Sequence, residues 1–416
     1  MSNRVKGNLV KLIGIPVIFL LLGFLLGSSG VLDNVFSRAM VFSSSGITGS
    51  KLFRKADNQF DRGEYNEASR SYSALIESGL FMEGKLGAAY ENRGWCRIRL
   101  GDYGPAEGDF DRAIQLNPGS AAAFNGRGWA KVKREEYDAA LDDFRTANDL
   151  SPRYAMVFTN HGVALANLGK RDEARKNYMR AVEIDNDREA KGYALLNLAW
   201  LDYQDGRFES AFALADQGVR ILPDYAMGYN DRGAIREDMG EYEEAIVDYS
   251  RAIELNRDPE AVAQSRLNRG VARLMAGNPD AAETDFTAVL HSQLPMREEA
   301  AIWLWIAMLK QGKTIDEIEE RISELIPKDQ LADWPSPALR LFQGKTSMDD
   351  YTASYWHPNP VKRRSRRAEM FFYAGQYLLY RGETGQAREY FQRSIDLEVI
   401  DTNATRMAKL ILEEMD

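Results

Sequence analysis

Small, aromatic and polar positions recur along this chain with a period of about 34 residues. In the unit at 87–120 they are occupied by Gly94, Tyr103, Ala106, Phe110 and Pro118. One period later the corresponding residues are Gly128, Tyr137, Ala140, Phe144 and Pro152. The spacing predicts two helices in each unit, with the glycine mid-way along the first helix and the alanine at the matching place on the second.

The glycine and the alanine allow the two predicted helices to cross closely. A bulkier side chain at either place would force the helix axes apart, at a cost of about 1–3 kcal/mol. Proline ends the second helix, because it lacks the N–H group and disfavours helical backbone just before it. One helix pair cannot bury enough apolar surface alone, so neighbouring pairs must stack. The predicted fold class is therefore an all-α superhelical solenoid.

This combination of spaced residues resembles the tetratricopeptide-repeat family. Seven such repeats fit residues 49–296 and a further helical pair fits 368–416, with an irregular helical region at 297–367 between them. The resemblance implies a chain that holds peptide segments of other proteins in a concave groove lined by the first helices.

The amino-terminal segment at 12–32 is uncharged and almost wholly apolar, long enough to cross a bilayer as a helix. A cleavable signal peptide is the alternative. Arg4, Lys6 and Lys11 precede the segment, and basic residues stay cytoplasmic. We therefore expect a cytoplasmic terminus at 1–11, a signal-anchor helix, a flexible linker at 33–48 and a repeat domain in the bacterial periplasm, tethered to the inner membrane by one pass.

The irregular region begins with an amphipathic, tryptophan-containing segment at 300–310 and a charged helix at 315–325. The Trp-Pro-Ser-Pro stretch at 334–337 and the helical pair from Phe371 to Leu397 follow. This arrangement resembles the C-terminal part of NlpI-type bacterial tetratricopeptide lipoproteins. The resemblance implies a periplasmic adaptor that recruits proteases or peptidoglycan hydrolases. Those lipoproteins carry a lipidated cysteine, but the single cysteine here, Cys96, lies far from residue 30.

Residues that would support catalysis, a metal or a cofactor are sparse. The three histidines are far apart in sequence, and no Ser/His/Asp grouping or metal-ligand pair at helical spacing is present. Two Gly-Lys-Thr tripeptides, at 312–314 and 344–346, lack the further glycine of a phosphate loop and are predicted to be turns that end helices. The formal charge of −9 argues against nucleic-acid binding. We therefore expect no enzyme, no cofactor and no metal.

A stripe of aromatic side chains is predicted on the concave face, at the position that follows the crossing glycine. Aromatic residues offer large, stiff contact areas and dominate binding hot spots. Polar residues accompany them at neighbouring positions of the first helices. The candidate groove residues are Glu91, Trp95, Arg99, Asn125, Trp129, Lys133, Trp200, Tyr203 and Asn230. The alternative is that these rings only pack between adjacent first helices.

One strongly basic run precedes the last helical pair. It comprises Lys362, Arg363, Arg364, Arg366 and Arg367. Its position predicts an exposed loop. We expect this loop to dock an acidic partner or an anionic glycan or lipid surface.

The leading hypothesis is a membrane-anchored scaffold for other proteins in the bacterial envelope. A peptidoglycan- or glycan-binding module that uses the same aromatic stripe is the first alternative. An enzyme with its site in 297–367 is the second, with His357 as its one unusual residue. Solenoids also dimerise readily, and the unit at 49–82 or the terminal helices could provide the contact of a homodimer.

Overall fold

The computed structural model describes residues 49–79, 85–184, 187–292, 296–325, 337–354, 360–397, 399 and 403–415. These residues form helices and turns and contain no strand, so the all-α prediction is confirmed for them. Within the same ranges, no helix combines the length and apolar character needed to span a bilayer. The predicted cytoplasmic terminus at 1–11, membrane helix at 12–32 and linker at 33–48 lie outside the described residues.

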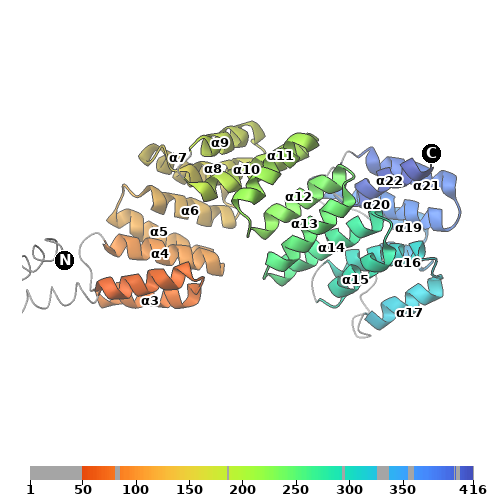
Figure 1. The fold of residues 1–416 in the computed structure, drawn as a ribbon, viewed down its shortest axis with the longest axis horizontal. Coiled ribbons are helices and arrows are strands. Elements are labelled where there is room, and N and C mark those ends of the chain that lie inside the picture. Colours follow the sequence, from red (N-terminus) through yellow and green to blue (C-terminus); the bar gives the residue numbers. More distant parts are fainter. Residues whose placement is uncertain are drawn as a thin grey trace, which may run out of the picture. The chain divides into compact units, whose positions relative to one another are not determined.

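The chain divides into two compact units, and unit 1 ends at Arg153 (Figure 1). Unit 1 is a stack of helix pairs. It consists of a helix over 49–61 followed by α3 (Tyr65–Ser78), α4 (Lys85–Leu100), α5 (Tyr103–Leu116), α6 (Ala121–Lys133) and α7 (Tyr137–Leu150). Each helix packs on the next one along the chain, as expected for a solenoid.

Unit 2 begins at Tyr154 and continues the same architecture. Its helix pairs are α8 (Ala155–Asn167) with α9 (Arg171–Glu183), α10 (Arg188–Gln204) with α11 (Phe208–Ile221), α12 (Ala226–Asp238) with α13 (Tyr242–Leu255), and α14 (Pro259–Met275) with α15 (Pro279–Leu290). The remaining helices are α16 (Arg297–Lys310), α17 (Ile315–Leu325), α18 (Pro337–Phe342), α19 (Met348–Ala353), α20 (Pro360–Tyr380), α21 (Thr384–Ile395) and α22 (Asn403–Met415).

An aromatic ring of the second helix lies over the crossing glycine of the first helix in most of these pairs. A Cβ atom added at Gly94 would lie 2.8 Å from Cζ of Phe110, closer than carbon atoms can approach. The same arrangement pairs Gly128 with Phe144, Gly162 with Tyr178, Gly233 with Tyr249, Gly270 with Phe286, and Gly375 with Phe391. The last of these pairs joins α20 to α21, so the C-terminal helical pair is built on the repeat geometry.

Gly126 of α6 gives a sharp test of this packing, because a Cβ atom there would collide with the Phe110 ring. We expect Gly126→Ala to lower the free energy of unfolding of unit 1 by about 1–3 kcal/mol through overpacking. Gly108→Ala is the matched control, since Gly108 lies mid-way along α5 with open space around it. It should instead stabilise the unit by roughly 0.5–1 kcal/mol. Chemical denaturation followed by circular dichroism measures both changes, and equal effects would contradict the packing described.

Four repeats share a buried aspartate on the second helix that the sequence analysis missed. Asp109, Asp143, Asp248 and Asp285 are at most 3 % exposed. Each accepts charge-assisted hydrogen bonds from two cations of the first helix, which lie 16 and 12 residues earlier. The cations are Arg93 and Arg97, Arg127 and Lys131, Arg232 and Arg236, and Arg269 and Arg273. These ion pairs fix the offset between the two helices of a repeat.

The predicted turns at the two Gly-Lys-Thr tripeptides are confirmed. Gly312 follows α16 with φ of 79° and Gly344 follows α18 with φ of 67°. Glycine suits both places, because other residues rarely adopt this left-handed backbone.

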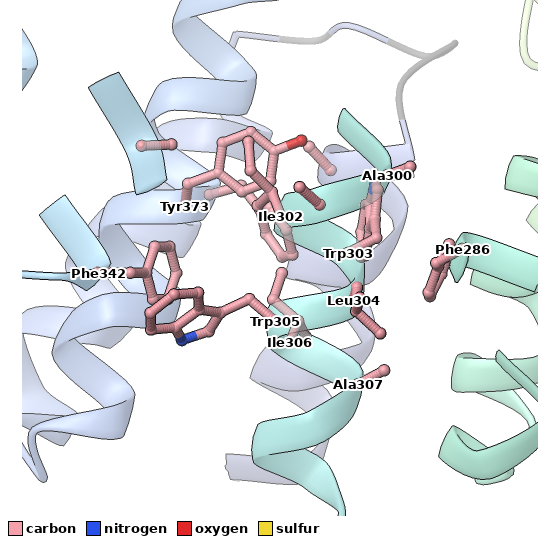
Figure 2. Packing of buried hydrophobic residues seen from close by; sticks show 14 of the residues in the cluster. Phe286, Ala300, Ile302, Trp303, Leu304, Trp305, Ile306, Ala307, Phe342 and Tyr373 are labelled. Carbon is pink, nitrogen blue, oxygen red and sulfur yellow. The ribbon is translucent and has the colours of Figure 1, made fainter. Parts of the chain in front are cut away.

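The tryptophan-containing helix α16 is not amphipathic, contrary to the expectation from its sequence. Nine consecutive residues, Ala300 to Met308, are buried, each at most 4 % exposed. Figure 2 shows why: Trp303 lies between Phe286 of α15 and Tyr373 of α20, and Trp305 points to Phe342 of α18. A helix covered on opposite sides is apolar all round. The helices α16 to α19 of this region thus contribute buried side chains to an extensive apolar cluster of unit 2. The charged helix predicted at 315–325 is α17, with the same bounds.

The basic run at 362–367 is helical, and the prediction of a loop there is wrong. It occupies the first two turns of α20, which begins at Pro360, earlier than the predicted pair at 368. Proline is favoured at the first position of a helix, and lysine and arginine are good helix formers. No glycine or further proline follows within the run to end the helix.

Candidate functional site

One face of unit 2 is formed by the first helices of three successive pairs, α10, α12 and α14, which lie side by side. The C-terminal helix α22 rests on this face. We call the surface of these three helices that α22 contacts the inner face. It holds α22 although the sequence separates that helix from Asp238 by more than 160 residues.

Arg406 of α22 anchors the helix on the inner face. Its side chain is 9 % exposed and its guanidinium group reaches two first helices. Nε donates to Asp238 at 3.1 Å, and one terminal nitrogen donates to the Tyr203 hydroxyl at 2.9 Å. The other terminal nitrogen lies 3.6 Å from Glu237. The tyrosine hydroxyl in turn donates to Asp238 at 2.6 Å, so the network is closed.

Burial governs the ionisation of this network. Removal from water raises the pKa of Glu237 above its usual range, and the charge of Arg406 opposes that effect. Tyr249 of α13 donates its hydroxyl to Glu237 at 2.6 Å. Burial also raises the pKa of Tyr249 well above its usual value, and so keeps the hydroxyl a donor. An arginine shared by two buried carboxylates holds the helices together firmly. Removal of any one partner is strongly destabilising, because it leaves a buried charge unpaired.

A cavity of about 290 Å³ opens beside Arg406 on the inner face. Its walls come from α10, α12, α14, α16, α20 and α22. The lining side chains with polar or aromatic character are Trp200, Asn230, Asp231, Gln264, Asn268, Glu299, Glu369, Tyr373, Asn403 and Arg406. Two residues predicted to bind a partner, Trp200 and Asn230, therefore meet here. Hydrogen bonds hold the Asn230 side chain in place, since its amide oxygen accepts from Ser265 at 3.2 Å and from Asn268 at 3.4 Å.

Two carboxyl groups of this cavity hold protons more tightly than exposed ones. Burial raises the pKa of Asp231 to about 7. Burial also raises the pKa of Glu299, although the Trp303 indole N–H donates to its carboxylate at 3.4 Å. With its amides and its aromatic wall at Trp200, the cavity can accept a hydrogen-bonding or basic side chain of a bound segment.

Asp231→Asn should stabilise unit 2 at alkaline pH. A folded pKa of about 7 lies above that of an exposed aspartate, so the folded state favours the protonated acid. Wild-type stability therefore falls as the pH rises through that value, whereas asparagine does not titrate. We expect the variant to be more stable by roughly 1–3 kcal/mol well above pH 7 and no more stable near pH 4. Urea denaturation across this pH range measures the difference, and a pH-independent difference would contradict the raised pKa of Asp231.

Most of the predicted groove residues of unit 1 take part in contacts within the unit. Glu91 accepts a hydrogen bond from the Ser120 hydroxyl, which caps α6, and burial raises the pKa of Glu91. Asn125 is fully buried, whereas Arg99 is exposed. The indole of Trp95 packs edge-on against Phe110 at 5.5 Å.

Trp95 and Trp129 are half-buried in one apolar cluster of unit 1, together with Phe110. Lys133 places its ammonium group over the Trp129 ring at 5.4 Å. The two indoles thus pack within the stack and keep part of their surface in solvent. Their role in binding stays a prediction.

In unit 2, Tyr203 is fully buried and its ring stacks on Trp200 at 5.1 Å. Its hydroxyl contacts α22 of the same chain rather than an open groove. Sequence reasoning missed Arg406, Glu237 and Asp238, because no local pattern links a C-terminal arginine to acids so far away. Within the described ranges, no group of histidine, cysteine and carboxylate side chains is arranged to hold a metal ion.

Comparison with family models decides the kind of repeat. Tetratricopeptide-repeat models match residues 53–121, 92–155, 153–224 and 226–259. The chain contains tetratricopeptide repeats. The models cover most of the helix pairs from α3 to α13, and this confirms the prediction made from the spaced glycine, alanine and aromatic residues. Tetratricopeptide repeats mediate protein–protein interactions.

Several solved structures are similar to this chain at low sequence identity. A tetratricopeptide repeat protein from Parabacteroides merdae is 18 % identical, with 62 % of this chain and 98 % of that chain covered and a TM-score of 0.45. PilF of Pseudomonas aeruginosa is also 18 % identical, with coverages of 55 % and 97 % and a TM-score of 0.45. The human IFIT1 dimer with m7Gppp-AAAA is 16 % identical, with coverages of 83 % and 80 % and a TM-score of 0.47. A comparison with curated proteins found no match.

Proposed function

We propose that the protein is a non-enzymatic scaffold that binds segments of partner proteins on the inner face of unit 2. Proteins built from tetratricopeptide repeats are generally non-catalytic scaffolds. The observation that carries the proposal is the packing of α22 on the inner face. This face binds a helix of the same chain through one buried basic side chain, Arg406. A cavity that could accept a further side chain lies beside Arg406 on the same face.

The cavity indicates how a partner segment would be held. Asp231, Glu299 and Glu369 surround it with carboxyl groups, while Trp200 and Tyr373 offer aromatic surface. A lysine or arginine of the partner would find a ring face there and carboxyl groups whose ionisation its own charge would favour. The partner would lie beside α22 and extend along the first helices. In unit 1, Trp95 and Trp129 are the predicted points of contact.

Site-specific crosslinking in cells tests this proposal. A photo-crosslinking amino acid replaces Asn268, which lines the cavity, or Val247, which is 66 % exposed on α13. We expect a discrete protein adduct from position 268 and none from position 247, with the 268 adduct lost when Trp200→Ala is added. The same adducts from both positions, or none from 268, would contradict binding at the inner face.

We also propose that the scaffold works in the bacterial envelope. The support is the apolar segment at 12–32, the basic residues before it, and the likeness of the C-terminal third to NlpI-type lipoproteins. The segment would anchor the chain in the inner membrane by one pass and place the repeats in the periplasm. There the scaffold would recruit proteases or peptidoglycan hydrolases.

The envelope proposal has its own test. Alkaline phosphatase, which is active only outside the cytoplasm, is fused after residue 416. We expect phosphatase activity in the membrane fraction, and loss of activity when residues 12–32 are deleted. An inactive fusion with the intact chain would contradict the periplasmic location, while leaving the binding proposal in place.

Homodimerisation belongs to the same proposal, with the unit at 49–82 as its contact. The alternative contact, α22, already buries Met407, Ala408 and Ile411 within unit 2. Its apolar side is therefore not available to a second copy. Analytical ultracentrifugation of the full chain and of a variant without residues 49–82 distinguishes a dimer from a monomer.

A further inference from the structure

A second pocket of unit 2, on α19, α20 and α21, combines arginines with aromatic rings. Its volume is about 390 Å³. Arg363, Arg367 and Phe371 line it from α20, and Tyr390 and Arg393 line it from α21. It includes two arginines of the basic run that the sequence analysis singled out. None of these residues lines the inner-face cavity.

The rings hold the guanidinium groups in place. Arg367 lies 5.7 Å and Arg393 lies 5.9 Å from the centre of the Phe371 ring, so two cations share one aromatic side chain. Arg393 also lies 5.3 Å from the centre of the Tyr390 ring. The two rings meet edge to face at 6.0 Å. Cation–π contacts of this kind orient arginines while their N–H donors stay free for a ligand.

The pocket carries an excess of positive charge. Of its three arginines, Arg393 forms an ion pair with Glu389 at 2.5 Å. Arg363 and Arg367 pair with no carboxylate in the part of the chain that the structure describes. They lie one helical turn apart on α20, so their side chains share a face of that helix. The pocket therefore presents two uncompensated guanidinium groups beside apolar ring surface.

We propose that this pocket binds an acidic segment of a partner protein, with a carboxylate between Arg363 and Arg367 and an aromatic side chain against Phe371 and Tyr390. Arginine matches a carboxylate with two parallel hydrogen bonds. The recessed, ring-lined shape favours a peptide side chain over a membrane surface. A flat anionic surface could bind Arg364 and Arg366, which are exposed on the same helix, equally well and would not need the pocket. The site goes beyond the inner face and would give the scaffold a second, independent docking point.

Fluorescence anisotropy on the purified full chain tests the proposal. The probe is a labelled Glu-Phe-Glu peptide, with a Gln-Phe-Gln peptide as its neutral counterpart. The pocket variant is Arg363→Gln with Arg367→Gln. The matched control is Arg364→Gln with Arg366→Gln, which removes the same charge from the same helix outside the pocket. A phosphoserine peptide and vesicles of phosphatidylglycerol are measured in parallel.

We expect the acidic peptide to bind, the neutral peptide not to bind, and the pocket variant to weaken binding at least about tenfold while the control changes it little. Equal losses in both variants would show a general charge effect and overturn the proposal. So would binding to vesicles alone, or tight binding of the phosphoserine peptide alone. None of the substituted arginines lines the inner-face cavity, so failure here leaves the inner-face proposal standing.

Discussion

Arg406→Ala should lower the free energy of unfolding of unit 2 by roughly 3–5 kcal/mol. The substitution leaves Glu237 and Asp238 without their shared cation, and Glu237 is only 2 % exposed. It also removes the hydrogen bonds that attach α22 to α10 and α12. Chemical denaturation of the full chain, followed by tryptophan fluorescence, measures the change.

The control for this prediction is Arg220→Ala. Arg220 is 77 % exposed and pairs with Asp216 of its own helix, so its loss should cost no more than about 0.5 kcal/mol. Adding Glu237→Gln to Arg406→Ala should recover part of the stability, because one unpaired acid is then neutral. If the two arginine variants were equally stable, the anchoring of α22 by Arg406 would be wrong.

Trp303→Ala should be similarly severe, with a loss of about 3–5 kcal/mol in unit 2. Trp303 is fully buried in an extensive apolar cluster of unit 2, where its ring lies between Phe286 and Tyr373 (Figure 2). Truncation would open a large cavity, because the surrounding helices α15 and α20 relax only in part.

Two further variants serve as controls for the stability lost in Trp303→Ala. Trp303→Phe keeps most of the ring and should cost clearly less than alanine. Trp200→Ala removes a half-buried indole from the same unit and should also cost less. The midpoint of urea denaturation ranks the three variants. A loss for Trp303→Ala no larger than that for Trp200→Ala would contradict the position of α16 in the core.

The repeats could be predicted from sequence because their determinants are local. Gly94 and Phe110 lie within one repeat, and residues of the same kind recur at the same spacing in other repeats. The sequence pattern therefore reports the same contact several times over. The Arg-Gly doublets at 93–94, 127–128, 232–233 and 269–270 also recur. The arginine of each doublet forms the buried ion pair with the aspartate that lies 16 residues later.

What the sequence could not provide depends on contacts between distant segments. Nothing in the run from Ala300 to Met308 reveals that α15, α18 and α20 cover it from different sides. The partners of Arg406 lie 168 and 203 residues away. The inner-face cavity was found only in part, through Trp200 and Asn230, because its other walls come from α16, α20 and α22.

We propose above all that the inner face of unit 2 binds a partner beside α22. The most direct test of this claim is the dissociation constant of the partner captured from position 268, measured by titration calorimetry for the full chain and for Asn268→Arg, with Val247→Arg as the control on α13. We expect Asn268→Arg to weaken binding at least about tenfold, because it fills the cavity with a bulky cation, and Val247→Arg to leave the affinity unchanged. Equal affinities for the two variants would contradict the claim.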